Sequence, residues 1–456
     1  MKSSVLAAIC SVLLVAGSSA QHQPTTVIFG ATLIDGTGAP PMPNAIIIIR
    51  ADRIADVGTS STVSIPTGAR VIDARGKFLL PGLIDTHVHL EAVGLSDIGE
   101  IPPEWSTPGK IRDLAVINAR LDLIAGFTTV RDLGSTAVVL SVRDDIDSGR
   151  LPGPRIVAAG MQLVRVSTDA PAASMFLEYE GRDSAHAKVR YLASMGADVI
   201  KIRLTHMRPV PSLEEVRAIV EEAHGLGIRA TVHTDVPADD LVALAIDAGA
   251  DGIEHNAPLR SQDSHVLARM ARLRMSLMAG AGAFFVQRLD TTRAIGVFDR
   301  AQARLLPEEV LAALRAGIDS LHRQTDHMKE SGWNAAHRQE SFIAEVQRAR
   351  QAGVLLVFGT DCGAYGMIHG EQYKALYGES NMGSSAMDVI LMATRDAAKA
   401  LGKAHELGTI EGGEFADMII IDADPLTDLR NLRQIFRVVK GGGIYDPAEL
   451  SSAPKH

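Results

Sequence analysis

The chain is poor in cysteine. Its 456 residues include 2 cysteines, Cys10 and Cys362, and Cys10 lies in a segment that we expect to be removed. A mature chain that keeps only Cys362 cannot form an internal disulfide. A fold that depends on disulfide cross-links is therefore excluded.

An excess of basic residues is also absent. The 45 lysines and arginines are outnumbered by 54 acidic residues, which gives a net charge of -9 and a pI near 5.9. This balance provides no cationic footprint for nucleic acid or for an anionic membrane. We therefore expect a small-molecule or short-peptide substrate and no nucleic-acid partner.

Long apolar runs are missing except near the N-terminus. Lys2 precedes an apolar run from Val5 to Gly17, and small residues ending at Ala20 follow it. A membrane anchor, the alternative, needs about 18 or more apolar residues. The pattern favours a signal peptide over residues 1–20, and the residues before Cys10 do not suit a lipoprotein cleavage site. We expect an exported protein, periplasmic or secreted, without membrane contact after cleavage.

The remaining composition is that of a globular protein, with 46% hydrophobic and 22% charged residues. Short β-type runs separated by turns occupy both ends of the chain, for example Ala45–Arg50 and Ala416–Asp422. They predict a small β-sandwich built from residues 21–80 and 405–456. A homo-oligomer is compatible with this sequence.

Between these ends, short apolar runs alternate with helical segments such as Leu213–Leu226, a pattern typical of a parallel sheet. Eight runs qualify as strands: Leu79–His89, Thr128–Leu133, Arg155–Ala159, Asp198–Leu204, Arg229–His233, Gly252–His255, Met275–Ala279 and Val354–Thr360. Eight β/α units predict an α/β fold with a TIM (β/α)8 barrel over residues 81–404. The stretch 283–348 is too long for a plain connection, and we interpret it as a lid or cap.

Two histidines end the first predicted barrel strand. His87 and His89 lie two residues apart, so on a strand both imidazoles point to the same face. Neutral imidazole is a good ligand for zinc and related divalent metals. The alternative, two polar residues at the mouth of a strand, remains open for this pair taken alone.

Three further candidate ligands also lie at strand ends. His233 ends the fifth predicted strand, His255 ends the sixth, and Asp361 follows the eighth. The carboxyl ends of barrel strands converge on one mouth, where active sites form. The four histidines are a small part of the 15 in the chain, and chance would scatter them over helices and loops. The sequence therefore predicts one shared metal site.

Lys201 lies within the fourth predicted strand. A cationic amine beside metal ions is unfavourable, and burial together with nearby positive charge lowers the pKa of a lysine. A neutral amine can add carbon dioxide and form a carbamate that bridges two cations. The alternatives are pairing with a carboxylate or an outward-pointing side chain. We favour the carbamate, N6-carboxylysine at Lys201.

These residues resemble the amidohydrolase superfamily. The matching motifs are Pro81–Leu90, Gly126–Asp132, Lys201, His233, His255, Gly359–Asp361 and Gly408–Asp422. Within the superfamily the chain is most similar to the imidazolonepropionase-related group. That group includes prolidase-like dipeptidases, metallo-carboxypeptidases and amidases acting on N-acyl amino acids, among them ochratoxin hydrolases.

The resemblance implies a binuclear centre with two divalent metal ions, usually zinc. His87, His89 and Asp361 would hold the more buried ion, and His233 and His255 the more exposed one. Carboxylated Lys201 and a hydroxide would bridge the two. Asp361 would take the hydroxide's proton and pass it to the leaving amine, a catalytic acid–base role.

Candidate substrate contacts are less specific. The family often has a histidine-containing motif after the third strand, whereas here Arg165 follows that strand and is a candidate carboxylate clamp. Arg203 and His206 follow Lys201, and His206 is a candidate catalytic donor to the substrate carbonyl. Tyr365 and His369 follow Asp361 and are candidates for lining the entrance. Each has a structural alternative, such as a solvated arginine or a loop histidine.

The sequence thus predicts a metal-dependent amidohydrolase, a dipeptidase, carboxypeptidase or amidase that cleaves a peptide or N-acyl amino acid. A deaminase, or a hydrolase of cyclic amides, esters or lactones, is the alternative on the same scaffold. Mononuclear deaminases of the superfamily lack the strand-four lysine, and Lys201 is present here. A non-catalytic binding protein is disfavoured because none of the ligand positions is lost.

Overall fold

The structure is a computed structural model of the chain. It describes residues 25–94, 105–168, 174–234, 239–255, 264–279, 300–317, 335–364, 367–381 and 383–452. The predicted signal peptide, residues 1–20, lies outside the described residues. None of the helices in the described part has the length and apolar character that a membrane crossing requires.

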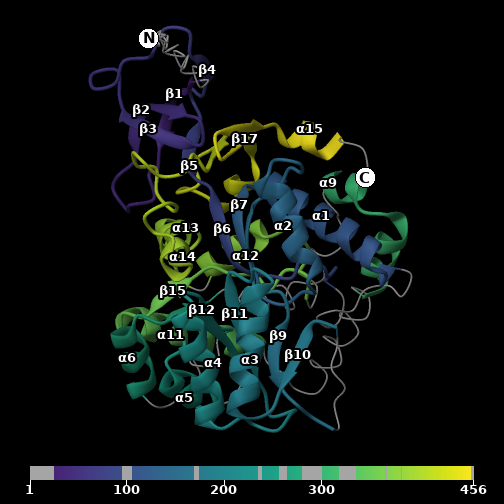
Figure 1. Cartoon of the computed structure of the whole chain (residues 1–456). Helices are drawn as coiled ribbons and strands as arrows, with labels where there is room; N and C mark the ends of the chain where they lie inside the picture. The colour runs from purple at the N-terminus through teal and green to yellow at the C-terminus, as the bar shows by residue number, and fades with distance from the viewer. Residues whose placement is uncertain are drawn as a thin grey trace, which may run out of the picture.

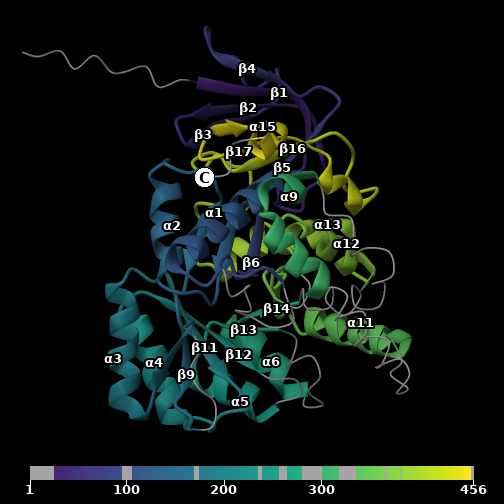
Figure 2. The ribbon, with the colours of Figure 1, turned by 90° about the vertical axis from the view of Figure 1, so that its right-hand side faces the viewer.

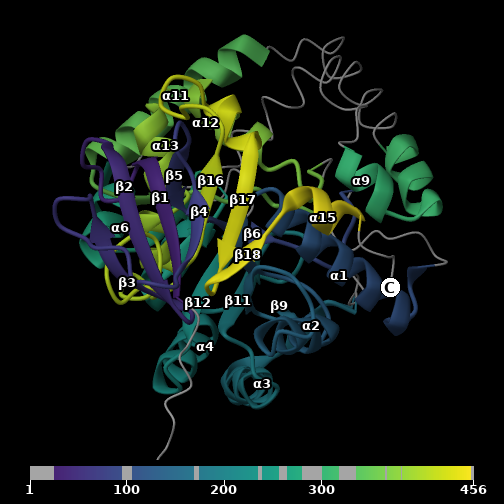
Figure 3. The same cartoon turned by 90° about the horizontal axis from the view of Figure 1, so that it is seen from above.

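Strands from both ends of the chain form one β unit. They are β1 (Thr25–Leu33), β2 (Met42–Arg50), β3 (Arg53–Gly58), β4 (Arg70–Asp73) and β5 (Phe78–Pro81) with β16 (Met418–Ile421), β17 (Ile435–Lys440) and β18 (Gly443–Tyr445). Hydrogen bonds join all of them into one sheet, in which β5 pairs with β16 (Figure 3). Because strand residues alternate between faces, Ile420 packs into the unit's own core while Ile419 and Ile421 pack onto the barrel core.

The middle of the chain forms a barrel of parallel strands. Its eight strands are β6 (Leu83–Val88), β7 (Phe127–Asp132), β8 (Arg155–Ala158), β11 (Val199–Leu204), β12 (Arg229–Thr234), β13 (Gly252–Glu254), β14 (Ser276–Met278) and β15 (Leu355–Val357). Each predicted barrel strand is present, and β6 to β8 and β11 to β15 form two parallel ladders. The prediction of a TIM barrel is confirmed.

Backbone hydrogen bonds connect the two ladders into a ring. On one side the Asp198 amide donates to the Ala158 carbonyl oxygen at 2.8 Å, which joins β8 to β11. On the other side the Thr86 amide donates to the Phe358 carbonyl oxygen at 3.1 Å, and the Asp361 amide donates to the His87 carbonyl oxygen at 2.8 Å. The end of the first barrel strand therefore lies directly beside the segment that follows the last.

Two strand predictions need correction. The run Leu79–His89 is divided at Gly82 into β5 and β6, which belong to different sheets. A Cβ atom at Gly82 would lie 2.0 Å from Oγ1 of Thr128, so only glycine fits where the chain passes from the β unit into the barrel. After β8 the chain also forms two unpredicted short strands, β9 (Gln162–Arg165) and β10 (Phe176–Tyr179), and β9 pairs with β11.

Helices surround the barrel (Figures 1 and 2). They include α1 (Pro108–Ile124), α2 (Val138–Asp147), α3 (Gly181–Ser194), α4 (Leu213–Gly225), α5 (Asp239–Ala248), α6 (Ser264–Leu273), α11 (Ala335–Gln351), α12 (Tyr373–Asn381), α13 (Ala386–Met392) and α14 (Arg395–Ala400). The predicted helix Leu213–Leu226 is α4, which begins at a capping box of Ser212 and Glu215.

Part of the long insertion packs on the outside of the barrel. Helix α9 (Arg300–Leu305) and the residues up to 317 are described, and they share a core with α1 through Leu121, Leu305 and Leu311. Trp105 belongs to the same core. Figure 1 shows α9 beside α1 and near the C-terminal helix α15 (Pro447–Ser452). Residues 283–299 and 318–334 lie outside the described part, so a lid over the barrel stays a prediction.

Candidate metal centre

Three of the candidate ligands meet where the barrel closes. The nearest ligand atoms of His87, His89 and Asp361 all lie within 4.8 Å of one another. Oδ1 of Asp361 lies 3.1 Å from Nε2 of His89 and 3.5 Å from Nε2 of His87. The backbone hydrogen bond between Asp361 and His87 holds the two segments at this spacing. One ion can therefore reach all three side chains.

Hydrogen bonds to the far ring nitrogens set which imidazole nitrogen faces the centre. Nδ1 of His89 lies 2.8 Å from the carbonyl oxygen of Gly134, which only accepts, so Nδ1 carries the proton. Nδ1 of His87 lies 3.0 Å from Oε2 of Glu254. In both residues Nε2 is left with a free lone pair, the arrangement found in metal-bound histidine.

His233 and His255 extend the cluster along the neighbouring strand ends. The ring centroids of His233 and His255 are 4.7 Å apart, and those of His255 and His87 are 5.0 Å apart. Nδ1 of His255 lies 4.0 Å from Oδ2 of Asp361. The structure thus brings all four histidines and Asp361 into one group.

Lys201 lies on β11, which pairs with β12, the strand that carries His233. It is 1% exposed, and among the described residues its Nζ has no hydrogen-bond partner. Burial lowers the pKa of Lys201 to about 7, even though the nearby carboxylates of Glu254 and Asp361 favour the charged form. A large share of this side chain is therefore a neutral amine at neutral pH.

Several buried polar atoms in the centre lack partners among the described residues. They are Nε2 of His89, Nε2 of His255, Nζ of Lys201 and Oδ1 of Asp361. Leaving one buried polar atom unpaired costs about 1–3 kcal/mol. Nitrogen and carboxylate oxygen donors gathered in this way fit a divalent cation of the zinc type.

Two of the candidate ligands have an unusual backbone. His255 and Asp361 have φ values of 64° and 61°, in the left-handed region that residues with a side chain rarely adopt. Each follows a barrel strand, so the chain turns sharply at the barrel mouth. Strain of this kind persists where the surrounding structure enforces it, and it is common at functional sites.

Sequence reasoning missed the residues that support the ligands. Glu254 is 1% exposed and accepts hydrogen bonds from Arg131 at 2.8 Å and from Thr231. Burial would raise the pKa of Glu254, but the charges of Arg131 and Lys201 outweigh it and hold the pKa below its usual value. The signal was a charged residue in each of two fully buried strands, Arg131 in β7 and Glu254 in β13.

Asp85 supports the centre from the other side. Its carboxylate accepts hydrogen bonds from the His87 amide at 3.1 Å, the Thr360 amide at 3.1 Å and the Thr360 hydroxyl at 2.5 Å. Burial raises the pKa of Asp85 to about 7. These contacts tie the start of the HxH segment to the residue that precedes Asp361.

His369, a predicted substrate contact, needs correction. It is 1% exposed, its Nδ1 lies 3.0 Å from both oxygens of Asp122, and its Nε2 lies 3.2 Å from the carbonyl oxygen of His89. Burial would lower the pKa of His369, but Asp122 outweighs it and raises the pKa. Both ring nitrogens face acceptors within the protein, so the ring supports the His89 backbone and leaves no ring nitrogen free for a substrate.

The other substrate candidates have varied surroundings. Arg165 forms an ion pair with Glu215 at 2.9 Å and lies 3.7 Å from Glu180, so the proposed carboxylate clamp is already taken by the protein's own acids. The guanidinium of Arg203 lies 5.9 Å from the ring centroid of Phe176. His206 has a 47% exposed side chain and lies 2.9 Å from Asp240. Tyr365 lies outside the described residues.

The chain is similar in sequence to one protein family and to several curated proteins. The model of the amidohydrolase family matches residues 78–444. Two curated relatives come from Symbiobacterium thermophilum. A 5-methylthioadenosine/S-adenosylhomocysteine deaminase is 25% identical over 87% of this chain and 85% of the deaminase. An imidazolonepropionase is 26% identical over 84% of this chain and 85% of the imidazolonepropionase.

The chain is also similar in structure to several solved proteins. The structure of a Xaa-Pro dipeptidase with bound methionine in the active site is 27% identical in sequence to this chain, with a TM-score of 0.73. The match covers 92% of this chain and 100% of the dipeptidase chain. A putative prolidase from Bifidobacterium longum is 25% identical, with a TM-score of 0.70 and coverage of 92% and 94%. The ochratoxinase of A. niger, at 21% identity, TM-score 0.72 and coverage of 93% and 96%, shares the fold.

Proposed function

The chain belongs to the amidohydrolase family, and from that premise we propose that it is a binuclear metal hydrolase that cleaves the amide bond of a dipeptide or N-acyl amino acid. The observation that carries the proposal is the position of Lys201, buried among the candidate ligands with an Nζ that has no partner among the described residues. A second cation next to this lysine requires a neutral or anionic group there. Lys201 can provide one by reacting with carbon dioxide.

The proposed ligand sets follow the geometry. His87, His89 and Asp361 hold one ion, since their ligand atoms lie within 4.8 Å of one another. His233 and His255, whose rings are 4.7 Å apart, hold the other. Two divalent metal ions, expected to be zinc, supply an acidified water and a polarised scissile carbonyl when bound.

Lys201 is the proposed bridge. The lone pair of the neutral Nζ forms a bond to the carbon of carbon dioxide, and one N–H proton leaves to solvent. The product is a carbamate anion, N6-carboxylysine, with two oxygen donors. The pKa of Lys201, lowered by burial to about 7, supports this step because only the unprotonated amine can react.

Asp361 is the proposed proton carrier. Burial would raise the pKa of Asp361, but the surrounding histidines, first His87, lower it well below its usual value. The carboxylate is therefore ionised and able to accept a proton from the attacking water. It then donates that proton to the leaving amine nitrogen, as a general base followed by a general acid.

His206 is the proposed catalytic donor to the substrate carbonyl. It follows β11, the strand of Lys201, and its side chain is 47% exposed at the end of the barrel where the candidate ligands gather. A donor aimed at the oxygen that gains negative charge stabilises the transition state. Arg203 lies between Lys201 and His206 in sequence and is the proposed contact for the substrate carboxylate.

The substrate class follows from the neighbours with dipeptidase and prolidase in their names, which are 27% and 25% identical to this chain. The main alternative is deamination, because three curated relatives are deaminases, at 25%, 24% and 22% identity. The buried Lys201 favours the amide hydrolase, since mononuclear deaminases of the superfamily lack this lysine. Cyclic amides, esters and lactones are the other chemistries of this scaffold.

The test is a substrate screen with the zinc-loaded chain of residues 21–456. We expect cleavage of dipeptides or N-acyl amino acids, loss of activity on chelation, and recovery on adding zinc. Asp361→Asn is the inactive control. Ammonia release from aminopurine nucleosides without cleavage of any amide would instead assign the deaminase function.

Export is also a proposal, and it rests on residues 1–20. Edman sequencing of the protein from the periplasm or medium of an expressing cell is expected to begin at Gln21. A protein that stays in the cytoplasm with its N-terminal segment intact would contradict this.

A further inference from the structure

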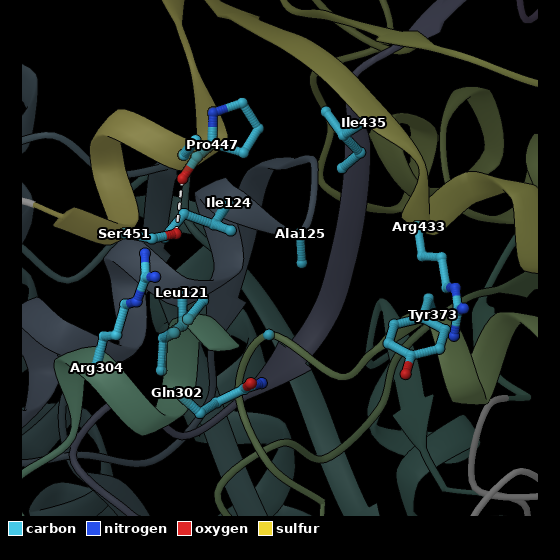
Figure 4. A pocket seen from close by; sticks show the side chains of 13 residues that line it. Leu121, Ile124, Ala125, Gln302, Arg304, Tyr373, Arg433, Ile435, Pro447 and Ser451 are labelled. Carbon is cyan, nitrogen blue, oxygen red and sulfur yellow. Dashed lines mark hydrogen bonds between the residues drawn. The ribbon is translucent and has the colours of Figure 1, made fainter. Parts of the chain in front are cut away.

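A cavity of about 280 Å³ lies outside the metal centre, and none of the candidate ligands lines it (Figure 4). Its walls come from α1, α9 and α15, with residues near the start of β17 and of α12 completing them. The barrel, the insertion and the C-terminal part of the β unit therefore all contribute. Its volume is slightly below the lower end of the usual range for small-molecule sites, roughly 300 Å³, which suits a small ligand.

The cavity is cationic. Among the described residues that line it, Arg304 and Arg433 are the charged ones, although acidic residues outnumber basic ones in the chain by 54 to 45. Figure 4 shows the two arginines on opposite sides of the cavity, with Arg433 beside Tyr373. Neither guanidinium is paired with a carboxylate of the described residues. A guanidinium without a carboxylate partner is a good site for the carboxylate of a ligand.

Gln302 provides an independent sign of a ligand. It is 1% exposed, and its Nε2 donates to the carbonyl oxygen of His369 at 3.1 Å. Because that carbonyl only accepts, the amide orientation is fixed and Oε1 points elsewhere. Among the described residues Oε1 has no hydrogen-bond partner, and Figure 4 shows the amide end directed into the cavity. A buried acceptor of this kind is satisfied by a donor that a ligand brings.

The remaining wall is largely apolar. Leu121, Ile124, Ile435 and Pro447 line the space between the two polar ends. We propose that this cavity is a second ligand site, which binds a small carboxylate with an apolar body and an N–H group, the chemistry of an N-acylated apolar amino acid. Arg433 and Tyr373 bind the carboxylate, Gln302 accepts the N–H, and the apolar wall takes the side chain.

The probe is N-methanesulfonyl-L-leucine, which has the carboxylate, the N–H and the apolar group but no carboxamide bond to hydrolyse. Binding is measured by isothermal titration calorimetry on the zinc-loaded chain of residues 21–456. We expect Arg433→Gln to raise Kd at least tenfold and Ala448→Trp, which fills the cavity, to abolish binding. The methyl ester of the probe is expected to bind at least tenfold more weakly.

Arg430→Gln is the matched control, because Arg430 lies in the same short helix (Leu429–Arg433) but pairs with Asp428 outside the cavity. It is expected to leave Kd unchanged. His233→Ala separates the cavity from the proposed active site and is also expected to leave Kd unchanged. Loss of binding in His233→Ala, equal binding by Arg433→Gln, or no binding to the parent chain would overturn the proposal. Binding of the probe requires no hydrolysis. The result for this cavity therefore does not depend on whether the proposed hydrolase function is correct.

Discussion

Oε2 of Glu254 lies 3.0 Å from Nδ1 of His87, while Oε1 of the same carboxylate lies 2.8 Å from Nη2 of Arg131. The acidic residue that directly precedes one candidate ligand, His255, therefore orients another. Arg131 keeps the carboxylate ionised, and the ionised carboxylate keeps the proton of His87 on Nδ1. The lone pair at Nε2 then faces Asp361, where the proposed metal lies.

Glu254→Gln is expected to weaken zinc binding about 10- to 100-fold, the usual effect of changing a residue that orients a metal-bound histidine. Glutamine keeps the size of the side chain but loses the charge. The measurement is a competition titration with a chelator of known affinity. Thr129→Val is the control, because Thr129 is a buried residue of β7 whose hydroxyl has no hydrogen-bond partner among the described residues. An unchanged zinc affinity in Glu254→Gln would contradict the role of this carboxylate.

Lys201→Ala is expected to reduce the metal content from two ions per chain to one, with loss of most hydrolytic activity, because the proposed bridge is removed. The metal content is measured by mass spectrometry of the digested protein. Lys374→Ala, in which the lost lysine pairs with Glu371 outside the cluster, is the control. If Lys201→Ala still binds two ions, the assignment of the bridge is wrong.

His369→Gln is expected to destabilise the fold by roughly 3–5 kcal/mol, because it leaves the buried Asp122 without its cationic partner. The free energy of unfolding in urea is the measurement, and KM is expected to change little. Adding Asp122→Asn should recover much of the stability by removing the unpaired charge. A normal stability combined with a tenfold higher KM would return His369 to the substrate site.

Glu379 gives a pH dependence of stability. It is fully buried, neither oxygen has a hydrogen-bond partner among the described residues, and burial raises its pKa from 4.5 to about 8. The unfolded chain ionises this group from about pH 4.5 upward, while the folded chain keeps it neutral until about pH 8. Its contribution to stability is therefore present in acid and is lost progressively between these two pH values.

Glu379→Gln should remove this loss. At pH 8 we expect the variant to be more stable than the parent chain, by on the order of a few kcal/mol at most, and at pH 4 the two should be close. The measurement is Tm across this pH range. Glu309→Gln, on an exposed residue of the 300–317 segment, is the control. Parallel Tm profiles for Glu379→Gln and the parent chain would argue that Glu379 ionises normally.

His206→Asn is expected to lower kcat by about 10²- to 10³-fold with a smaller change in KM, if His206 donates to the developing oxyanion. Its partner at 2.9 Å, Asp240, allows a control. Asp240→Asn removes the ion pair but keeps the imidazole, and it should retain most of the activity. Full activity in His206→Asn would limit this histidine to the surface pair with Asp240.

Much of the fold could be predicted from the sequence because its signals are local. Short apolar runs mark the eight strands, and four histidines at or near strand ends indicate the barrel mouth. The strand break at Gly82 could not be predicted in this way. It depends on the close approach of Thr128, a residue on the next barrel strand.

The parts of the site that could not be predicted depend on partners distant in sequence. Asp122 lies 247 residues from His369, and Glu254 lies 167 residues from His87. Arg165 looks like a free loop arginine until packing brings Glu215 to it from the start of α4. A spacing rule finds residues that share one strand, as His87 and His89 do, but it carries no information on which helix lies behind them.

The hydrogen bonds from Gln302 to the carbonyl of His369, and from His369 to the carbonyl of His89, have a consequence for protein engineering. They give the outer face of the barrel a mechanical connection to the backbone of a proposed metal ligand. Libraries designed to adjust the metal centre could therefore vary residues around Gln302 and leave every ligand unchanged. Such variants would alter the position of His89 from behind, a route that substitutions inside the barrel mouth do not offer.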